Sequence, residues 1–275
     1  MRAPIPVLLS QKSRSRPAMR HLIVEEPYSD SALWSRRLAL FAMAVVLIGL
    51  VFARIGLDST AVLAVVGSGI GIACLAMLCA GAAAIVIWRT GRKSVSLLLS
   101  GSFIALLVLA YPAYLAYQAV RLPPLHDITT DIDDPPSFSL SHEALAARKG
   151  FTPLSVAPTL RELQLDAYPD VQPIILDLDA NDAYQTVLNT VAALHWALAD
   201  SQPPSGRLGL GHVDAIARGF LLGFPNDITI RIRPLAGQAR IDIRSVSRIG
   251  QHDFGANARR ILAFTDELKS EADQK

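Results

Sequence analysis

The sequence predicts a membrane protein in which three N-terminal transmembrane helices precede an α+β soluble domain with an antiparallel sheet. Long apolar runs without charged residues occur only before residue 122. After that point the apolar residues follow the spacings of strands and amphipathic helices. The charge divides at the same place, because residues 1–121 carry 12 Lys and Arg against 4 Asp and Glu, whereas residues 122–275 carry 14 against 20.

The first 32 residues are polar and basic and contain proline, so residues 1–32 are predicted to form a disordered cytoplasmic tail. Residues 33–121 then hold the three apolar runs. The second and third runs exceed the roughly 20 residues that cross a bilayer. The first is shorter, but flanking apolar residues extend it and its flanking arginines can reach the interfaces. The predicted spans are about 34–57, 59–88 and 94–120.

Positive charge predicts the orientation of these helices, because cytoplasmic loops are enriched in Lys and Arg. Seven Lys and Arg precede or begin the first helix, and Arg89, Arg92 and Lys93 lie between the second and third. Only Arg54 lies between the first and second. We therefore expect a multi-pass protein of the bacterial inner (plasma) membrane, with a cytoplasmic N-terminus and a periplasmic C-terminal domain. The lipid bilayer is its first expected partner.

The second span carries small residues at a spacing that favours close helix packing. Gly67 and Gly71 are followed by Ala76, Ala80 and Ala84. This face either packs within the three helices of one chain or forms a homo-oligomer through Gly67 and Gly71. The interior of the spans holds no ionisable residue, which argues against an ion or proton pathway.

Residues 122–173 are rich in Pro and Asp and are predicted to form extended segments over the domain surface, with one short helix near 141–149. Residues 174–275 form the predicted α+β core. Its order is strand, helix, strand, strand, strand, helix, which gives an antiparallel sheet. The bounds of these elements are about 174–179, 182–199, 212–224, 227–233, 240–247 and 254–268.

The hairpin of the last two strands carries the most informative charge pattern. Its isoleucines alternate with charged residues, so one face covers the core and the other gathers arginines. A turn midway between the strands places Arg231 opposite Asp242 and Arg233 opposite Arg240, with Arg244 on the same face. Two arginines opposite each other are unfavourable unless something compensates their repulsion.

Two interpretations of this arginine face remain open. In the first, Asp177 and Asp179 of the first strand neutralise it through a lattice of salt bridges. In the second, the arginines bind a phospholipid head group, a phosphorylated polymer or the carboxylates of an envelope protein, because guanidinium groups grip oxyanions bidentately. The residues predicted to bind an anion or partner are Arg231, Arg233, Arg240, Arg244, Arg248, His252 and Arg260.

The connection into the final helix is a second candidate anion site. Arg248 and His252 lie near the predicted N-terminus of that helix, whose free amides attract anions. Asp253 is a natural N-cap residue there. The alternative is that this loop only caps the helix and packs against it.

Two stretches of the soluble half resemble a known family. One is Arg-Ser-x-Ser-Arg-x-Gly-x-x-Asp-x-Gly-x-Asn-x-Arg-Arg-Ile, and the other is Asp-Ile-Thr-Thr-Asp followed by Asp-Pro-Pro-x-Phe. They are similar to the ending and the opening of a bacterial and plastid domain of unknown function, number fourteen ninety-nine, over about residues 122–270. The resemblance implies a shared fold, a shared surface and frequent membrane anchoring, but no activity. Its motif positions here are Asp127, Thr130, Asp131, Pro135, Ser247, Gly250, Asp253, Gly255 and Asn257.

Several other chemistries lack support in the sequence. The acidic soluble half is a poor candidate for nucleic-acid binding, which requires a cationic surface. We expect no cofactor and no metal, because a calcium loop counted from Asp131 would place Pro136 and His142 where it needs Gly and Glu. Cys74 and Cys79 both lie in the second span, so the soluble half has no thiol nucleophile.

We therefore expect a periplasmic binding or interaction domain, anchored in the membrane, rather than an enzyme. One alternative is a hydrolase-like enzyme that uses His252 and Arg248 with the acidic segment 127–134. Another is a membrane scaffold that acts through its helices. An enzyme requires a pocket where its groups converge, whereas a binding surface requires exposed arginines without carboxylate partners.

Overall fold

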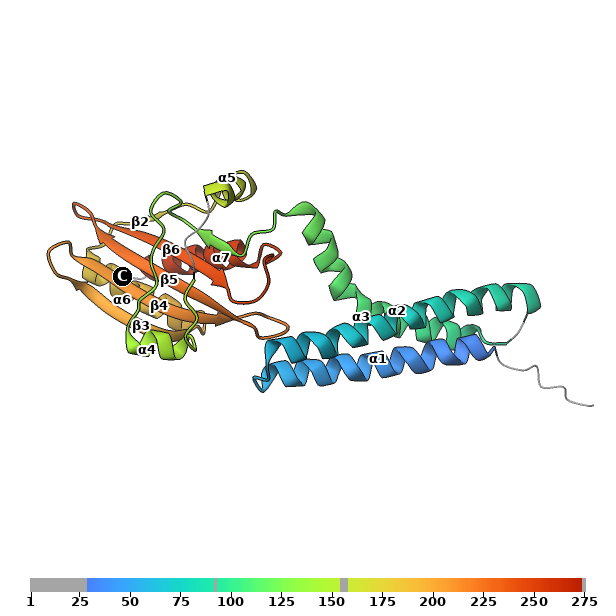
Figure 1. Ribbon diagram of the computed structural model, residues 1–275. Coiled ribbons are helices and arrows are strands. Elements are labelled where there is room, and N and C mark those ends of the chain that lie inside the picture. The colour runs from blue at the N-terminus through green and yellow to red at the C-terminus, as the bar shows by residue number, and fades with distance from the viewer. Residues whose placement is uncertain (1–28, 92, 154–157, 274–275) are drawn as a thin grey trace, which may run out of the picture.

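The computed structural model describes residues 29–91, 93–153 and 158–273, and it joins a helical bundle to a sheet domain (Figure 1). The basic tail predicted for residues 1–32 falls almost wholly outside the described residues. The three predicted apolar helices are confirmed, and each is long and apolar enough to cross a membrane. They are α1 (Asp30–Arg54), α2 (Ser59–Thr90) and α3 (Val95–Arg121).

Local chemistry explains where these helices begin and end. Asp58 caps α2 by accepting hydrogen bonds from the amides of Thr60 and Ala61 at 2.9 and 3.1 Å. At the other end of α2, Gly91 takes the left-handed conformation (φ 69°), which glycine adopts at little cost. Pro112 lies inside α3, and the helix leans away from α1 and α2 toward the domain in its last turns (Figure 1).

Small residues bring the three helices together. Ala39, Ala76 and Ala105, one from each helix, form a buried cluster. Gly101 of α3 lies so close to α1 that an added Cβ would be 2.8 Å from the amide nitrogen of Arg36. A larger residue at this position would therefore separate the two helices.

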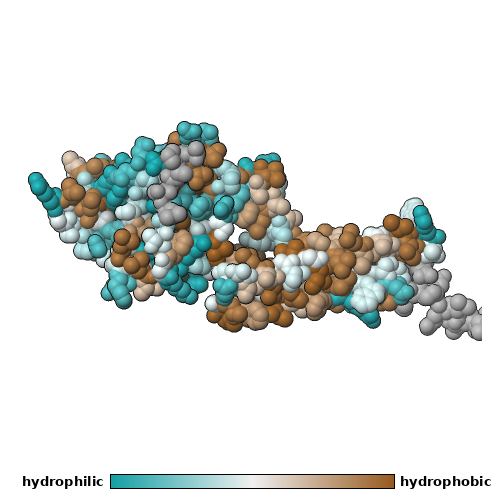
Figure 2. Space-filling model, in the orientation of Figure 1, coloured by the Kyte–Doolittle hydropathy of each residue, from teal (hydrophilic) through white to brown (hydrophobic). Residues whose placement is uncertain are grey.

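Gly67 and Gly71 face away from the bundle. An added Cβ at either position would have no atom within 4 Å, whereas Gly69 packs against Val46 of α1. Gly67 and Gly71 therefore do not pack within the chain, and Gly69 makes that contact instead. Ala76 and Ala80 of the same predicted face are buried in the bundle, as the interpretation of packing within one chain expects. Apolar residues dominate the surface of the bundle seen in Figure 2, as expected for helices in contact with lipid.

An antiparallel six-stranded sheet forms the centre of the soluble domain, so the predicted fold class is confirmed. Five strands follow the order β1-β6-β5-β4-β3, and β2 pairs with another part of β6. The strands are β1 (Asp127–Thr129), β2 (Ile174–Leu176), β3 (Ala197–Ser205), β4 (Leu210–Arg218), β5 (Pro225–Pro234) and β6 (Ala239–Ser247). The helices are α4 (His142–Ala147), α5 (Pro158–Ala167), α6 (Ala180–Ala193) and α7 (Ala256–Ala272).

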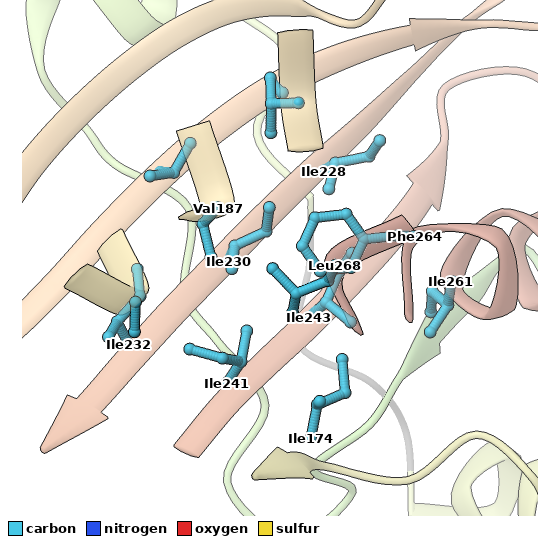
Figure 3. Packing of buried hydrophobic residues seen from close by; sticks show 14 of the residues in the cluster. Ile174, Val187, Ile228, Ile230, Ile232, Ile241, Ile243, Ile261, Phe264 and Leu268 are labelled. Carbon is cyan, nitrogen blue, oxygen red and sulfur yellow. The ribbon is translucent and has the colours of Figure 1, made fainter. Parts of the chain in front are cut away.

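The apolar core lies between one face of the sheet and helices α6 and α7 (Figure 3). The isoleucines that the alternation predicts to face inward are fully buried there, against Val187 of α6 and Phe264 and Leu268 of α7. Burial of each such side chain favours folding by about 1.5–3 kcal/mol. These isoleucines are Ile228, Ile230, Ile232, Ile241 and Ile243.

Four strands rather than the predicted three lie between α6 and α7. The additional strand is β3, which occupies the end of the helix predicted over 182–199 and the loop after it. The helix stops at Ala193, and His195 just beyond it takes a left-handed conformation (φ 55°). β3 includes Pro203 and Pro204, which are tolerated because β3 is an edge strand.

The segment 122–173 contains more regular structure than predicted. The short helix expected near 141–149 is present as α4, but the sequence pattern does not predict β1 or α5. β1 has three residues and is defined by its pairing with β6, so no local period could indicate it. The strand predicted over 212–224 ends earlier, at Arg218, and a turn follows before β5.

Replacing Gly101 by Ala is expected to destabilise the helical bundle by about 1–3 kcal/mol, because the new Cβ would press on the backbone of Arg36. Gly81→Ala is the matched control, since a Cβ at that position has no atom within 4 Å and only raises helix propensity. Thermal unfolding of both variants in detergent micelles measures the difference. Equal melting temperatures for the two variants would contradict this packing.

Candidate functional site

The face of the sheet that points away from α6 and α7 is charged. The strand register confirms the predicted pairing, with Arg231 opposite Asp242 and Arg233 opposite Arg240. Part of the segment 122–173, called the covering segment below, runs across this face and covers it (Figure 1). As a result, the side chain of Asp242 is fully buried, and those of the three arginines are only 15–31% exposed.

Asp242 lies at the centre of this face, among three guanidinium groups. Its carboxylate oxygens are 3.1 Å from Arg231, 3.0 Å from Arg233 and 2.8 Å from Arg240. The contacts with Arg231 and Arg240 are hydrogen bonds. The Nε of Arg233 is not aligned for a hydrogen bond, so that contact is purely electrostatic.

Two further aspartates, from the covering segment, complete the pairing. Asp131 contacts the same three arginines at 3.3, 2.8 and 2.8 Å. Asp134 contacts two of them at 3.0 and 3.1 Å. These contacts compensate the repulsion between Arg233 and Arg240. We call the resulting set of three arginines and three aspartates the arginine–aspartate lattice: Arg231, Arg233, Arg240, Asp131, Asp134 and Asp242.

The interpretation that assigned neutralisation of the arginine face to Asp177 and Asp179 is wrong. Asp177 accepts a hydrogen bond from Gln238 at 2.5 Å, and Asp179 caps the N-terminus of α6. Strand β2 pairs with β6 over residues 239–241 only, and it ends before either aspartate. The arginine face is neutralised by the covering segment and by Asp242 instead.

Three more arginines on this side of the domain each pair with a carboxylate. The pairs are Arg244 with Asp127 (2.6 Å), Arg248 with Asp227 (2.6 Å) and Arg148 with Asp214 (2.7 Å). None of these six side chains is more than 12% exposed. The ring of Phe138 lies 5.3 and 5.5 Å from the guanidinium carbons of Arg148 and Arg244. Such burial requires complete pairing, because an isolated buried charge is costly.

Burial acts against the charged form of the central carboxylates. It raises the pKa of Asp242 and that of Asp227 above the ordinary value, and the neighbouring arginines offset only part of the effect. Asp200 on β3 differs. Burial raises its pKa, but hydrogen bonds from Ser139 and Ser141 outweigh burial and leave the pKa below its ordinary value. Loss of an arginine partner would disfavour the charged form of Asp242 still further.

Residues 247–257, at and before the start of α7, bind the backbone of the chain that follows α3. The side-chain amide of Asn257 and the backbone amide of Ser247 both donate to the carbonyl of His126, at 2.9 and 2.8 Å. The backbone amide of Asp253 donates to the carbonyl of Leu125 at 2.8 Å. The carboxylate of Asp253 accepts hydrogen bonds from two amides at the start of α7. The N-cap residue of α7 is Gly255 rather than the predicted Asp253, but the carboxylate of Asp253 still pairs with amides at the start of the helix.

The predicted anion site at the start of α7 has its polar groups already occupied. The Nε2 of His252 lies 3.2 Å from the carbonyl oxygen of Leu122, and Nδ1 accepts a hydrogen bond from the amide of Phe254. Arg260 donates to the hydroxyl of Ser245 at 3.0 Å. Burial lowers the pKa of Arg260 to about 10, so this residue remains charged at neutral pH.

The remaining motif positions hold backbone conformations or line a cleft. Thr130 exchanges hydrogen bonds with the backbone of Ile243 at 2.9 Å in both directions. Gly250 and Gly255 have φ values of 81° and 74°, a region that other residues rarely adopt. Pro135 lies in the wall of the cleft.

A cleft of about 340 Å³ opens beside the charged face. Its apolar wall includes Phe138 and Pro153, and Ser137 and Thr152 contribute hydroxyl groups. Arg161 of α5 also lines the cleft, and its buried Nε–H has no hydrogen-bond partner among the described residues. Sequence reasoning missed Arg161, because α5 has no pattern strong enough to separate it from the surrounding loop.

The groups required for a hydrolase-like site do not converge. His252 is engaged by backbone groups, and Arg248 is paired with Asp227. In segment 127–134, Asp127, Asp131 and Asp134 pair with other arginines. Within the described residues, no group of three or more His, Cys, Asp or Glu side chains is arranged to hold a metal ion.

Removal of Asp242 should unfold the domain more readily than removal of Asp134. Asp242→Ala leaves three arginines without their buried partner, and we expect a loss of about 3–5 kcal/mol in the free energy of unfolding. Asp134 is 69% exposed, so Asp134→Ala is expected to cost less than about 1 kcal/mol. Denaturant unfolding of the full chain in detergent measures the free energy of unfolding of both variants. Similar losses in the two variants would contradict the central role of Asp242 in the lattice.

The comparison with known proteins agrees with the two motifs. The model of one family, described as a protein of unknown function (DUF1499), matches residues 127–268. A search of curated proteins finds no match. The matched stretch begins at Asp127, which pairs with Arg244, and ends in α7. Because it covers more than half of the chain, the protein belongs to the DUF1499 family of unknown function.

Proposed function

We propose that the protein is a membrane-anchored binding module whose soluble domain faces the periplasm and receives an anionic envelope component. The observation that carries this proposal is the cleft lined by Arg161. The Nε–H of Arg161 is buried and lacks a hydrogen-bond partner among the described residues. A buried donor without an acceptor costs free energy, so an anion in the cleft would recover that hydrogen bond and neutralise the charge.

The arginines of the charged face are not the main ligand contacts in this proposal, although Arg244 lines the cleft. Arg231, Arg233 and Arg240 are balanced by three aspartates of the lattice, and Arg244 and Arg248 are each paired. An anion on this face would have to displace a carboxylate that is already in contact. The ligand is therefore assigned to Arg161, beside the face that the sequence predicts, rather than to the face itself.

The lining of the cleft favours an acidic group carried on an apolar body. Arg161 and the hydroxyls of Ser137 and Thr152 would contact the acidic group, whereas Phe138 and Leu140 offer apolar contacts. Leu140 is 68% exposed and so is available to a ligand. An anionic phospholipid has this combination of groups, and the bilayer around α1, α2 and α3 would supply it.

The orientation of the chain supports this assignment. Lys and Arg are concentrated before α1 and between α2 and α3, which favours the cytoplasm for both of those segments. The soluble domain follows α3 and is therefore assigned to the periplasmic side of the inner membrane. A fusion of alkaline phosphatase to the C-terminus, active only outside the cytoplasm, would test this orientation in cells.

Arg161→Gln is expected to weaken the binding of a short-chain phosphatidylglycerol by roughly 10- to 100-fold, because one charged hydrogen bond contributes about 1.5–3 kcal/mol. Calorimetric titration of the full chain in an uncharged detergent measures this. Arg207→Gln, at an exposed turn between β3 and β4, is the matched control and should bind as the parent does. Equal affinity of the parent and Arg161→Gln would refute the assignment, as would absence of binding by the parent. Titration with inorganic phosphate separates recognition of the head group from that of the whole lipid.

A second candidate function is that of a scaffold that self-associates in the membrane. The observation that favours it is the position of Gly67 and Gly71, which have open space above them on the lipid-facing side of α2. Two glycines one helical turn apart allow the backbones of two helices to approach closely. We propose that a second copy of the chain packs here.

Gly71→Leu is expected to weaken self-association at least about tenfold, equivalent to about 1.4 kcal/mol, because the new side chain would hold the two helices apart. Energy transfer between labelled copies in lipid vesicles measures the association at several protein-to-lipid ratios. Ala110→Leu enlarges an exposed residue on α3 and serves as the control. A transfer efficiency unchanged by Gly71→Leu would exclude this contact.

A further inference from the structure

The turn between β4 and β5 is an apolar loop on a charged domain. Residues 219–224 read Gly-Phe-Leu-Leu-Gly-Phe. Phe220 is 91% exposed, which makes it one of the two most exposed large apolar residues among those described. A phenylalanine held in water at the tip of a turn is unfavourable, since transfer of apolar surface out of water is a main stabilising effect in proteins. Exposure of this kind indicates a surface that is covered in the working protein.

Part of the backbone of this loop is paired within the loop. The amide of Gly219 donates to the carbonyl of Phe224 at 2.9 Å, and the amide of Gly223 donates to the carbonyl of Gly219 at 3.0 Å. The guanidinium of Arg218 donates to the carbonyl of Gly223 at 3.3 Å. These hydrogen bonds satisfy part of the polar backbone of the loop, which lowers the cost of moving the loop into the bilayer interface.

The loop lies at the end of a membrane-spanning helix. The guanidinium of Arg54, the last residue of α1, donates to the carbonyl of Phe220 at 2.6 Å. Ile55 and Leu57, which follow Arg54, are 67% and 43% exposed. Figure 1 shows the β4–β5 turn reaching down from the sheet toward the bundle. The level of the loop relative to the bilayer is therefore set by α1 itself.

We propose that the loop of residues 219–224 inserts into the outer interface of the same bilayer that α1, α2 and α3 span. The 25 residues of α1 extend about 37 Å, somewhat more than the hydrocarbon thickness of about 30 Å, so Arg54 lies at its outer edge. The hydrogen bond from Arg54 to the carbonyl of Phe220 holds Phe220 at the same depth. The loop continues an apolar surface already formed by the helices, so lipid is its occupant. The soluble domain is then held at the membrane by α3 and by this loop.

The test uses the full chain in nanodiscs of phosphatidylcholine, with or without acyl chains brominated near the head group. Phe220→Trp reports from the loop, and Leu208→Trp is the matched control. Leu208 is 72% exposed and lies in the turn at the other end of β4, far from the bundle. The emission of the parent, from Trp34, Trp88 and Trp196, is subtracted from each variant. Thermal unfolding confirms that both variants remain folded.

We expect the added emission of Phe220→Trp to be quenched several-fold by brominated lipid and to be protected from iodide in the water. The added emission of Leu208→Trp should show the opposite behaviour. Quenching of Phe220→Trp by lipid no greater than that of Leu208→Trp would overturn the proposal. In that case, access of iodide would place the loop in water, and exclusion of iodide would show that a protein surface covers it.

Discussion

The soluble domain depends on one electrostatic requirement, which is that each buried or half-buried arginine on the charged face of the sheet has a carboxylate partner. Removing a guanidinium group from water costs several kcal/mol, and only close opposite charge and hydrogen bonds offset it. Asp242 supplies one such charge from within the hairpin, but one carboxylate cannot balance three arginines. The sheet therefore requires Asp131 and Asp134, which come from a different part of the chain.

The same requirement joins the three apolar helices to the domain. Asp127 follows the end of α3 by only six residues, and it pairs with Arg244 of the central strand β6. The backbone between the end of α3 and Asp127 is held by Asn257 and Asp253, which donate hydrogen bonds to the carbonyls of His126 and Leu125. The linker is thus part of the domain rather than a flexible tether. Six aspartates pair with the arginines on this side of the sheet, and three of them, Asp127, Asp131 and Asp134, come from the segment that follows α3. Separation of that segment from the sheet would leave the arginines with half of their carboxylate partners.

The sequence predicts features that depend on local period and leaves out those that depend on distant contacts. The spans, the inward isoleucines and the pairing of Arg231 with Asp242 all follow from composition, alternation and one turn position. The partners of the arginines do not, because Asp131 lies about 100 residues before them and Asp177 offered a nearer candidate in an alternating strand. The two prolines of β3 argue against a strand when only the sequence is considered. They are tolerated because β3 lies at the edge of the sheet.

A cluster of arginines in a sequence is a poor guide to binding, because their net charge depends on what the fold brings to them. The three lattice arginines, together with Arg244 and Arg248, are neutralised by carboxylates of which the local pattern identifies only Asp242. Arg161 stands beside Glu162 in a short helix and has no signal of its own, yet its Nε–H is the buried arginine donor that lacks both a hydrogen bond and an ion pair among the described residues. Of the neutralised arginines, Arg244 lines the cleft together with Arg161. In our proposal, the Nε–H of Arg161, which has no hydrogen-bond partner among the described residues, is therefore the group on which a ligand would gain most.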